Sequence, residues 1–270
     1  MQKTILITGS TDGIGLEATS MLVSQGHNVL LHGRNPAKLE EVARTLSGRQ
    51  NRGRVESYVC DLSQLSEVVV LANEVAERHT KLDVLINNAG VLKTSIPTTQ
   101  EGLDVRFVVN AIAPYLLTKN LLPLMGTSGR VINLSSAAQS PVDPEALAGH
   151  IKLSDDLNAY AQSKLAITMW SRSMALSLKG TGPVIIAVNP GSLLGTKMVK
   201  EGFGIAGKDI RIGAEILTRL ALSDDFDDAS GLYFDNDTGR LASPHPDALD
   251  PEKSQAIVHA IEAVILATAL

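Results

Sequence analysis

The stretch Thr4-Ile-Leu-Ile-Thr-Gly-Ser-Thr-Asp-Gly-Ile-Gly15 decides the fold of this chain. Its first five residues are mostly apolar or β-branched, so they predict a short buried strand that ends at Gly9. Residues Leu16 to Gln25 predict a helix, which Gly26 ends. A strand, a glycine-rich turn and a helix in this order are what a dinucleotide-binding βαβ unit requires. The glycines let the backbone approach a pyrophosphate, and the helix N-terminus favours its negative charge.

The rest of the chain repeats this alternation of strands and helices. Strands are predicted at residues 28–32, 54–59, 82–86, 130–134, 183–188 and 231–234. Helices are predicted at residues 36–46, 64–79, 100–124, 158–178, 211–222 and 251–266, with Asp250 as the cap of the last one. We therefore expect an α/β fold, a doubly wound, Rossmann-type parallel sheet with helices on both faces. No repeat or linker divides residues 1–270, so we expect a single domain.

Composition excludes several classes of protein. Of the 270 residues, 44% are apolar and 20% are charged, which is typical of a globular chain. The net charge of −5 and the lack of a long basic run argue against nucleic acid as a partner. The single cysteine, Cys60, excludes an intrachain disulfide and fits a reducing compartment. The sequence shows neither a signal peptide nor an apolar run of membrane-spanning length, so we expect a cytoplasmic protein without a membrane anchor. A homo-oligomer is left open.

Polar residues and glycines follow the predicted strands, where a parallel sheet binds its ligands. Arg34 stands 19 residues after Gly15, at the place where an acidic residue would bind a ribose 2′-hydroxyl and indicate NAD. A guanidinium there can pair with a 2′-phosphate instead. This favours NADP(H) over NAD(H), although a merely solvated arginine is the alternative.

Tyr160 and Lys164 are four residues apart on a predicted helix and so share one face. A nearby ammonium lowers the pKa of a phenol, which makes the pair a candidate general acid/base. The alternative is a half-buried tyrosine beside a solvated lysine. Asn110 lies in an apolar stripe, and Pro114 cannot donate to its carbonyl, so a local kink is predicted there.

Two segments between the predicted elements read as functional loops. Residues 137–157 form a long polar loop, and residues 192–208 are glycine-rich and are predicted to form a mobile lid. Apolar residues near this lid indicate either a hydrophobic carbonyl compound as substrate or simple packing of the lid. They are Leu193, Leu194, Met198, Phe203 and Ile205. The histidines are scattered, and no metal site is expected.

Taken together, these motifs resemble the short-chain dehydrogenases/reductases over nearly the whole chain. The gap of 24 residues from Ser136 to Tyr160, the segment 99–104 and the segment 231–234 look like the retinol-dehydrogenase-like branch. The resemblance implies four catalytic residues, with the second serine of the 135–136 pair acting: Asn110, Ser136, Tyr160 and Lys164. It also implies a cofactor site made of Gly9, Ser10, Gly13, Ile14, Gly15, Arg34, Asn35, Asp61, Leu62, Asn88, Ala89, Gly90, Tyr160, Lys164, Pro190, Gly191, Leu193 and Thr196. Thr196 falls one position later than the family pattern.

The expected function is an NADP(H)-dependent oxidoreductase that interconverts a carbonyl, ketone or aldehyde, and an alcohol, with Tyr160 as general acid/base. Asn110 would hold a water that links Lys164 to solvent. Two alternatives stay open at this stage. A non-catalytic NADP-binding regulatory protein would use the same fold but would not need all four catalytic residues. An epimerase or dehydratase shares the Tyr/Lys pair, yet it usually has a different glycine spacing and a longer C-terminal domain. Consumption of NADPH with ketones and aldehydes would separate these possibilities.

Overall fold

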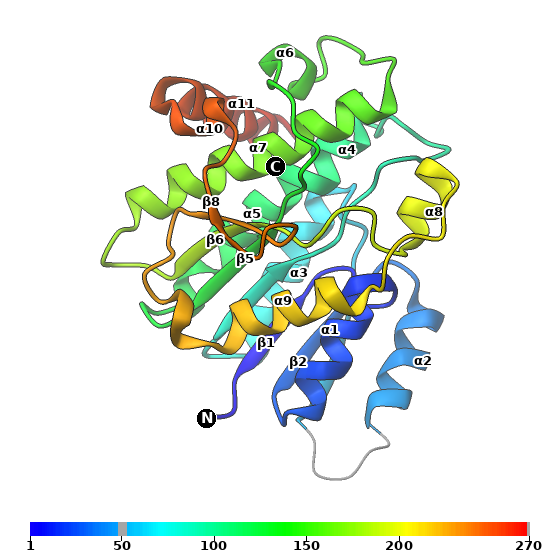
Figure 1. The fold of residues 1–270 in the computed structure, drawn as a ribbon, viewed down its shortest axis with the longest axis vertical. Coiled ribbons are helices and arrows are strands. Elements are labelled where there is room, and N and C mark those ends of the chain that lie inside the picture. Colours follow the sequence, from blue (N-terminus) through cyan, green and yellow to red (C-terminus); the bar gives the residue numbers. More distant parts are fainter. Residues whose placement is uncertain (48–52, 269–270) are drawn as a thin grey trace.

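A computed structural model describes residues 1–47 and 53–268 (Figure 1). These residues form one eight-stranded sheet in the order β3-β2-β1-β4-β5-β6-β7-β8. Strands β1 to β7 pair in parallel, and β8 is antiparallel to β7. The strands are β1 Thr4–Ile7, β2 Asn28–Gly33, β3 Val55–Val59, β4 Val84–Asn87, β5 Arg130–Leu134, β6 Val184–Asn189, β7 Tyr233–Asp235 and β8 Arg240–Ala242. The predicted fold class is confirmed.

Long helices cover both faces of the sheet (Figure 1). On one face α1 packs against α9, and on the other α3 packs against α5 and α11 against α7. Their bounds, with that of α2 beside β2 and β3, are α1 Gly13–Ser24, α2 Pro36–Ser47, α3 Leu65–Arg78, α5 Ala113–Leu121, α7 Asp156–Ser177, α9 Arg211–Leu222 and α11 Pro251–Thr268.

Two apolar cores result, because successive side chains of a strand point to opposite faces. In β1, Leu6 joins the core under α3, α5 and α7, while Ile5 and Ile7 join the core under α1 and α9. All three side chains are fully buried. Strand β1 lies between β2 and β4, so the sheet continues on one side of β1 with β2 and β3 and on the other side with β4 to β8. The carboxyl end of β1 is therefore the point at which a doubly wound sheet opens a crevice for its ligand.

The predicted helix over residues 100–124 is wrong at its start and in its regularity. Gly102 turns the chain with a φ of 85°, and Asp104 caps a short α4 (Val105–Phe107) by accepting from the Arg106 N–H at 2.9 Å. A π-helical turn, η1 (Val108–Ile112), follows before α5, and a 3₁₀ turn, η2 (Leu122–Leu124), ends the unit. The Ala113 N–H donates to the Val108 carbonyl, five residues back. The irregularity predicted around Asn110 is thus a π turn.

Short elements that the sequence did not predict account for the remaining differences. The polar loop of residues 137–157 contains α6 (Pro144–Leu147), and the segment 192–208 contains α8 (Lys197–Phe203). A 3₁₀ turn η3 (Asp224–Phe226), strand β8 and α10 (Pro246–Leu249) lie between α9 and α11. The cap predicted for the last helix is confirmed, since the Asp250 carboxylate accepts from the Glu252 N–H at 2.9 Å.

One segment, Val105–Leu124, is long and apolar enough to cross a membrane by length and composition, with a mean hydropathy of 1.2. However, 67% of that window is buried inside the fold, where α5 packs on α3 and η1 packs on α7. Its apolar character is therefore explained by its place in the core.

Candidate active site

The glycine-rich turn lies at the carboxyl end of β1 and opens α1. Gly9 and Gly13 adopt φ of 66° and 53°, which side chains rarely tolerate. A Cβ on Gly9 would lie 2.9 Å from the Ala89 Cα, and a Cβ on Gly15 would overlap the Gly9 carbonyl oxygen. These glycines are needed for close backbone approach, and they form a cradle in front of the α1 N-terminus. The residues present therefore fit a dinucleotide pyrophosphate.

Ser10 and Ile14, the other two predicted residues of this turn, make contacts within the protein. Ser10 is fully buried, and its hydroxyl donates to the His32 carbonyl at 3.1 Å. The Ile14 side chain lies against Gly213 of α9, where a Cβ would come within 3.2 Å of it. Ser10 therefore offers a ligand only its backbone, whereas the Ile14 side chain is half-buried.

A residue that the sequence analysis missed, His32, ties the glycine turn to the neighbouring strands. Its Nδ1 accepts from the Gly9 N–H at 3.1 Å, and its Nε2 lies 3.1 Å from the Cys60 carbonyl. A carbonyl can only accept, so Nε2 carries the proton and the ring is neutral. Burial lowers the pKa of His32 to about 4, despite opposing effects of the Cys60 carbonyl and Asp61. The only sequence signal was a polar residue inside an otherwise apolar strand.

Arg34 and Asn35 follow β2, beside the glycine turn. Arg34 is exposed, and Asn35 accepts from the Lys38 N–H at 3.1 Å in the first turn of α2. Lys38 Nζ lies 3.0 Å from Asp12, which itself caps α1 by accepting from the Gly13 N–H. Arg34 is therefore an exposed cation directly after β2, and Lys38, four residues on, is paired with Asp12 of the glycine turn.

The predicted cofactor-binding residues after β3 and β4 make hydrogen bonds or core contacts within the protein. Asp61 accepts from both the N–H and the hydroxyl of Ser63, and the Leu62 side chain is buried in the core. Asn88 donates to the Thr8 and Gly9 carbonyls at 2.9 and 3.1 Å, which joins β4 to the glycine turn. Ala89 N–H donates to the Thr8 hydroxyl at 3.1 Å.

Gly90 brings the two sides of the site together. A Cβ there would lie 3.4 Å from Asn110 Oδ1 and 3.5 Å from Lys164 Nζ. Both polar groups therefore face the backbone that follows β4. The same position also lies 3.7 Å from Met198 of α8, so α8 reaches over this part of the site.

Tyr160 and Lys164 lie on one face of α7, as predicted, and Lys164 Nζ is 5.6 Å from the centre of the Tyr160 ring. Lys164 is 3% exposed, and its ammonium donates to the Leu134 carbonyl at 2.7 Å. Burial lowers the pKa of Lys164 to about 7. Burial also raises the pKa of Tyr160, and the side-chain hydrogen bond with Ser136 opposes this rise. The predicted lowering of the Tyr160 pKa by Lys164 is not what the structure shows, because burial raises this pKa and only the hydrogen bond with Ser136 opposes it.

The two serines after β5 point in different directions. Ser135 is buried, and its hydroxyl bonds the Lys164 carbonyl at 2.9 Å and the Thr168 hydroxyl at 2.7 Å. Ser136 Oγ accepts from the Ala138 N–H at 3.1 Å and interacts with the Tyr160 side chain. Ser136 is thus the serine of the pair that faces the candidate acid/base.

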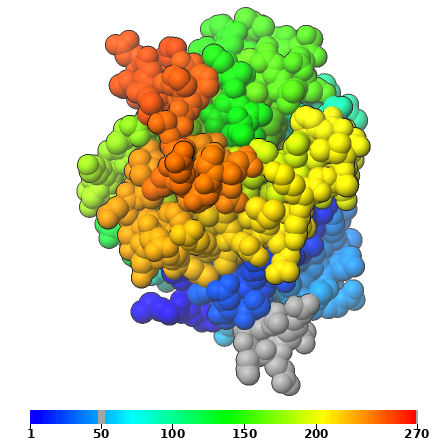
Figure 2. Space-filling view, viewed as in Figure 1, coloured from blue at the N-terminus to red at the C-terminus, as the bar shows by residue number. Residues whose placement is uncertain are grey.

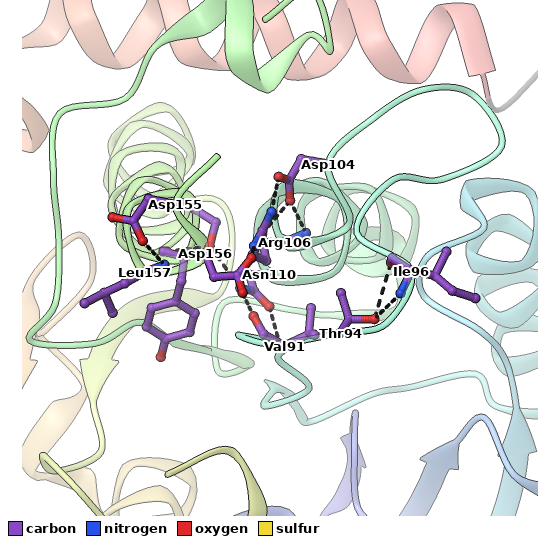
Figure 3. A network of polar contacts seen from close by, with 11 residues as sticks. Val91, Thr94, Ile96, Asp104, Arg106, Asn110, Asp155, Asp156 and Leu157 are labelled. Carbon is purple, nitrogen blue, oxygen red and sulfur yellow. Dashed lines mark hydrogen bonds and ion pairs between the residues drawn. The ribbon is translucent and has the colours of Figure 1, made fainter. Parts of the chain in front are cut away.

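Asn110 is fully buried in the π turn and uses its whole side chain to hold a neighbouring loop (Figure 3). Its Oδ1 accepts from the Val91 N–H at 2.8 Å, and its Nδ2 donates to the Val91 carbonyl at 2.9 Å. The same Nδ2 donates to the Ser163 hydroxyl at 2.9 Å. The amide therefore fixes the segment after Gly90 to α7. The water contact expected of Asn110 stays a prediction.

The same region contains an ionic network around the buried Arg106 (Figure 3). Arg106, 2% exposed, donates from Nε to Asp104 at 2.8 Å and also pairs with Asp156 at the start of α7. This network joins α4 to the helix that carries Tyr160 and so fixes the position of that helix.

Beyond β6, Pro190 and Gly191 lead into a loop in which Leu193 has a φ of 57°, a left-handed conformation for a branched side chain. Thr196 caps α8 by accepting from the Val199 N–H at 3.2 Å. Its Cγ2 lies 3.5 Å from where a Gly13 Cβ would be. The structure thus brings Thr196 to the glycine turn even though it falls one position late in the sequence pattern.

A cavity of about 380 Å³ opens between α8 and the start of α7. It is lined by Leu92, Lys93, Ser154, Asp155, Asp156, Leu157, Gly202 and Phe203. Leu157 precedes Tyr160 by one helical turn, so the cavity reaches the N-terminal turn of the helix that carries the candidate acid/base. Among the described residues, no cluster of histidine, cysteine and acidic side chains is arranged to hold a metal ion.

Known proteins share this arrangement. A family model described as short chain dehydrogenase matches residues 3–203. Retinol dehydrogenase 13 of Mus musculus is 32% identical over 273 residues, which cover 94% of this chain and 81% of the relative. A protein of Mycobacterium paratuberculosis, described as uncharacterised, superposes with a TM-score of 0.81 at 26% identity, covering 97% of this chain and 93% of that one. A short chain dehydrogenase of Escherichia coli CFT073, solved with NADPH, gives a TM-score of 0.70 at 27% identity over 87% of this chain and 96% of that one.

The chain belongs to the short-chain dehydrogenase family. Within that family it falls in the retinol-dehydrogenase-like branch, as its sequence indicates. It is therefore an oxidoreductase that uses a nicotinamide dinucleotide and acts on small molecules.

Proposed function

We propose that the protein is an NADP(H)-dependent oxidoreductase that interconverts a carbonyl compound and an alcohol, with Tyr160 as general acid/base. The observation that carries this proposal is the meeting of Ser136, Tyr160 and Lys164 next to Gly90, beside the glycine turn. Glycine backbone would hold the pyrophosphate, and Lys164 would hold the ribose. When bound, the cofactor supplies or accepts the hydride at the substrate carbon.

The proton chemistry follows from the environment of Tyr160. In carbonyl reduction, negative charge develops on the substrate oxygen, and the Tyr160 hydroxyl donates a proton to it. Burial, which raises the pKa of Tyr160, keeps this side chain in the acid form that the step needs. Ser136 already accepts from the Ala138 N–H, so its own hydroxyl hydrogen is available to donate to the same oxygen.

Lys164 suits the task of restoring the proton. Its pKa of about 7 lets it gain and lose a proton at neutral pH, and it lies on the Tyr160 face of α7. In this proposal Asn110 also has a positioning part. By holding both backbone groups of Val91, Asn110 fixes the segment that follows Gly90, where Lys164 faces the site.

Preference for NADP(H) is the second part of the proposal, and Arg34 supports it. The exposed guanidinium follows β2, where it can pair with a 2′-phosphate, and Lys38 lies within the first turn of α2 beside Asp12. A charge-assisted hydrogen bond of this kind corresponds to roughly tenfold or more in affinity.

The segment 192–208 is proposed to act as a lid over the substrate cavity. Backbone hydrogen bonds close its base, from Gly195 N–H to the Lys208 carbonyl at 2.6 Å and from Lys208 N–H to the Leu193 carbonyl at 2.7 Å. Gly202 of the lid packs so closely on Leu92 that a Cβ would lie 2.8 Å from it. Leu92, Leu157 and Phe203 line the cavity beside four polar or charged residues, so the proposed substrate is an aldehyde or ketone with an apolar part that these three side chains would contact.

The test is NADPH consumption with a series of aldehydes and ketones of increasing apolar length, with NADH in parallel and the matching alcohols with NADP⁺. We expect turnover that improves with apolar length and is at least about tenfold more efficient with NADPH than with NADH. Failure of every substrate in both directions would overturn the proposed activity. Equal efficiency with both cofactors would overturn the NADP(H) preference alone.

A further inference from the structure

The turn between β7 and β8, residues 235–237, meets the loop that follows β6. Strand β7 pairs in parallel with β6, and Asn189 is in register with Asp235. Both strands therefore end at the same edge of the sheet, so the turn emerges beside the loop of residues 189–192. In the space-filling view the orange surface after β7 lies against the yellow surface of the segment after this loop (Figure 2).

Four polar backbone groups of the 189–192 loop are held by this turn or by the Asn189 side chain. The Asn189 carbonyl accepts from the Asn236 N–H at 3.1 Å, and the Pro190 carbonyl accepts from Asn236 Nδ2 at 2.9 Å. The Gly191 N–H donates to Asn189 Oδ1 at 3.2 Å. The Ser192 N–H donates to Asp237 Oδ1 at 2.8 Å, and the Ser192 hydroxyl donates to the same carboxylate.

The side chain of Asn189 joins the two acidic residues of the turn. Its Nδ2 donates to Asp235 at 2.9 Å and to Asp237 at 2.8 Å, and Asn189 itself is 2% exposed. Burial alone would raise the pKa of Asp237. Hydrogen bonds from Ser192 and Asn189, together with the charge of Lys208, outweigh burial and hold this pKa below its ordinary value. The carboxylate is therefore ionised at neutral pH, and its hydrogen bonds are charge-assisted.

The same strand also supports the other side of the site. Tyr233, two residues before Asp235, donates from its hydroxyl to the Ser136 carbonyl at 3.1 Å. Side chains two apart in a strand share one face, so Tyr233 and Asp235 both face the site from β7. The turn is thus attached to a strand that contacts the Ser136 loop as well.

We propose that the 235–237 turn positions the 189–192 loop to receive the nicotinamide end of the cofactor, with Asn236 and Asp237 as its positioning residues. This inference rests on the proposed function, because it assigns the loop to that cofactor. Four strands, β1, β4, β5 and β6, separate β7 from β2, the strand that leads to Arg34. Arg34 is proposed to bind the opposite, adenine-ribose end. Removing the Asn236 or Asp237 side chain is therefore expected to affect binding of the nicotinamide end of the cofactor and to leave binding of the adenine-ribose end unchanged.

The experiment compares two ligands on the full chain. NADPH carries both ends of the cofactor, whereas 2′,5′-ADP carries only the adenine-ribose end. Asp237→Ala and Asn236→Ala are each expected to weaken NADPH binding about tenfold or more, because the charge-assisted hydrogen bonds of the exposed Asp237 or the backbone contacts of the half-buried Asn236 are lost. Binding of 2′,5′-ADP is expected to stay within about twofold. Asp237→Asn retains one acceptor for the Ser192 N–H and is expected to give an intermediate loss.

Asp228→Ala is the matched control, since it removes an exposed acidic residue that precedes β7 and lies outside the turn. It is expected to leave both affinities unchanged. Unchanged NADPH binding in Asp237→Ala and Asn236→Ala would overturn the inference and leave the proposed function standing. Equal weakening of both ligands would also overturn it, because that result indicates a general loss of structure. A wild-type protein that binds 2′,5′-ADP but not NADPH, or neither ligand, would overturn the proposed function and the inference with it.

Discussion

His32 gives a prediction whose size follows from the structure. Its ring is neutral, 3% exposed, and accepts from the Gly9 N–H in the glycine turn. Its pKa is about 4 in the folded protein and 6.5 in the unfolded chain. Between these values the unfolded chain binds a proton that the folded protein does not, so acid favours unfolding. The stability contributed by neutral His32 is present above pH 6.5 and is lost as the pH falls toward 4.

The shift corresponds to about 3 kcal/mol over the whole window, with a slope near ~1.4 kcal/mol per pH unit around pH 5. The perturbation is His32→Gln, which cannot titrate but keeps an acceptor for the Gly9 N–H. Urea unfolding of both proteins at about pH 7 and about pH 4.5 gives four free energies of unfolding. Other groups that titrate in this range contribute equally to both proteins. The wild type is therefore expected to lose about 2 kcal/mol more than the variant over this interval.

The reasoning would be refuted if the two proteins showed the same pH dependence, because His32 would then titrate alike in the folded and unfolded states. A smaller difference would mean that water reaches the ring. NADPH affinity, measured for the wild type and His32→Gln as the pH falls, gives a second test. Protonation of Nδ1 removes the acceptor for the Gly9 N–H, so the wild type is expected to lose affinity below about pH 5 more steeply than the variant.

Two further predictions address cofactor binding. Arg34→Asp is expected to weaken NADPH binding roughly tenfold or more, because a like charge replaces the partner of the 2′-phosphate, while NADH binding stays the same or improves. The control is Arg44→Asp, at the other end of α2. Equal losses of NADPH affinity in both variants, measured by fluorescence titration, would argue against the role of Arg34. Gly13→Val is expected to weaken NADPH binding sharply, because a φ of 53° strains a branched residue where the backbone must meet the pyrophosphate. The control is Gly26→Val, which carries similar strain away from the site, at a φ of 87° with open space around it. Equal NADPH affinity in the two variants would contradict the assignment of the turn.

The fold could be predicted because its signals are local. Ile5, Ile7 and Leu6 read as a strand from four consecutive residues, and the glycine turn and α1 follow directly in sequence. The short elements carried weak local signals. Strand β8 has only three residues and depends on pairing with β7, and α8 has no buried residue of its own. Pro114 indicated an irregularity around Asn110, but its form, a π turn packed against α7, carried no local signal.

The site was predictable to the extent that its residues follow strand ends or share a helix face. Tyr160 and Lys164 are of this kind, and the structure brings them together with Ser136. The supporting contacts could not be predicted, because they join residues far apart in the chain. His32 meets Gly9 across 23 residues, and Ser192 meets Asp237 across 45. Likewise, the pKa of Tyr160 depends on burial, which spacing alone does not reveal.

The most direct test of the central claim is the rate of carbonyl reduction by Tyr160→Phe. The ring and its packing are retained, and only the proton donor is lost. Tyr115→Phe is the matched control, since it also removes a tyrosine hydroxyl, one that bonds Glu262 at 2.8 Å away from the site. With NADPH and a substrate for which chemistry is rate-limiting, Tyr160→Phe is expected to lower kcat at least ~10²-fold while NADPH affinity changes little. Tyr115→Phe should keep near wild-type turnover. Near wild-type kcat in Tyr160→Phe would contradict the account.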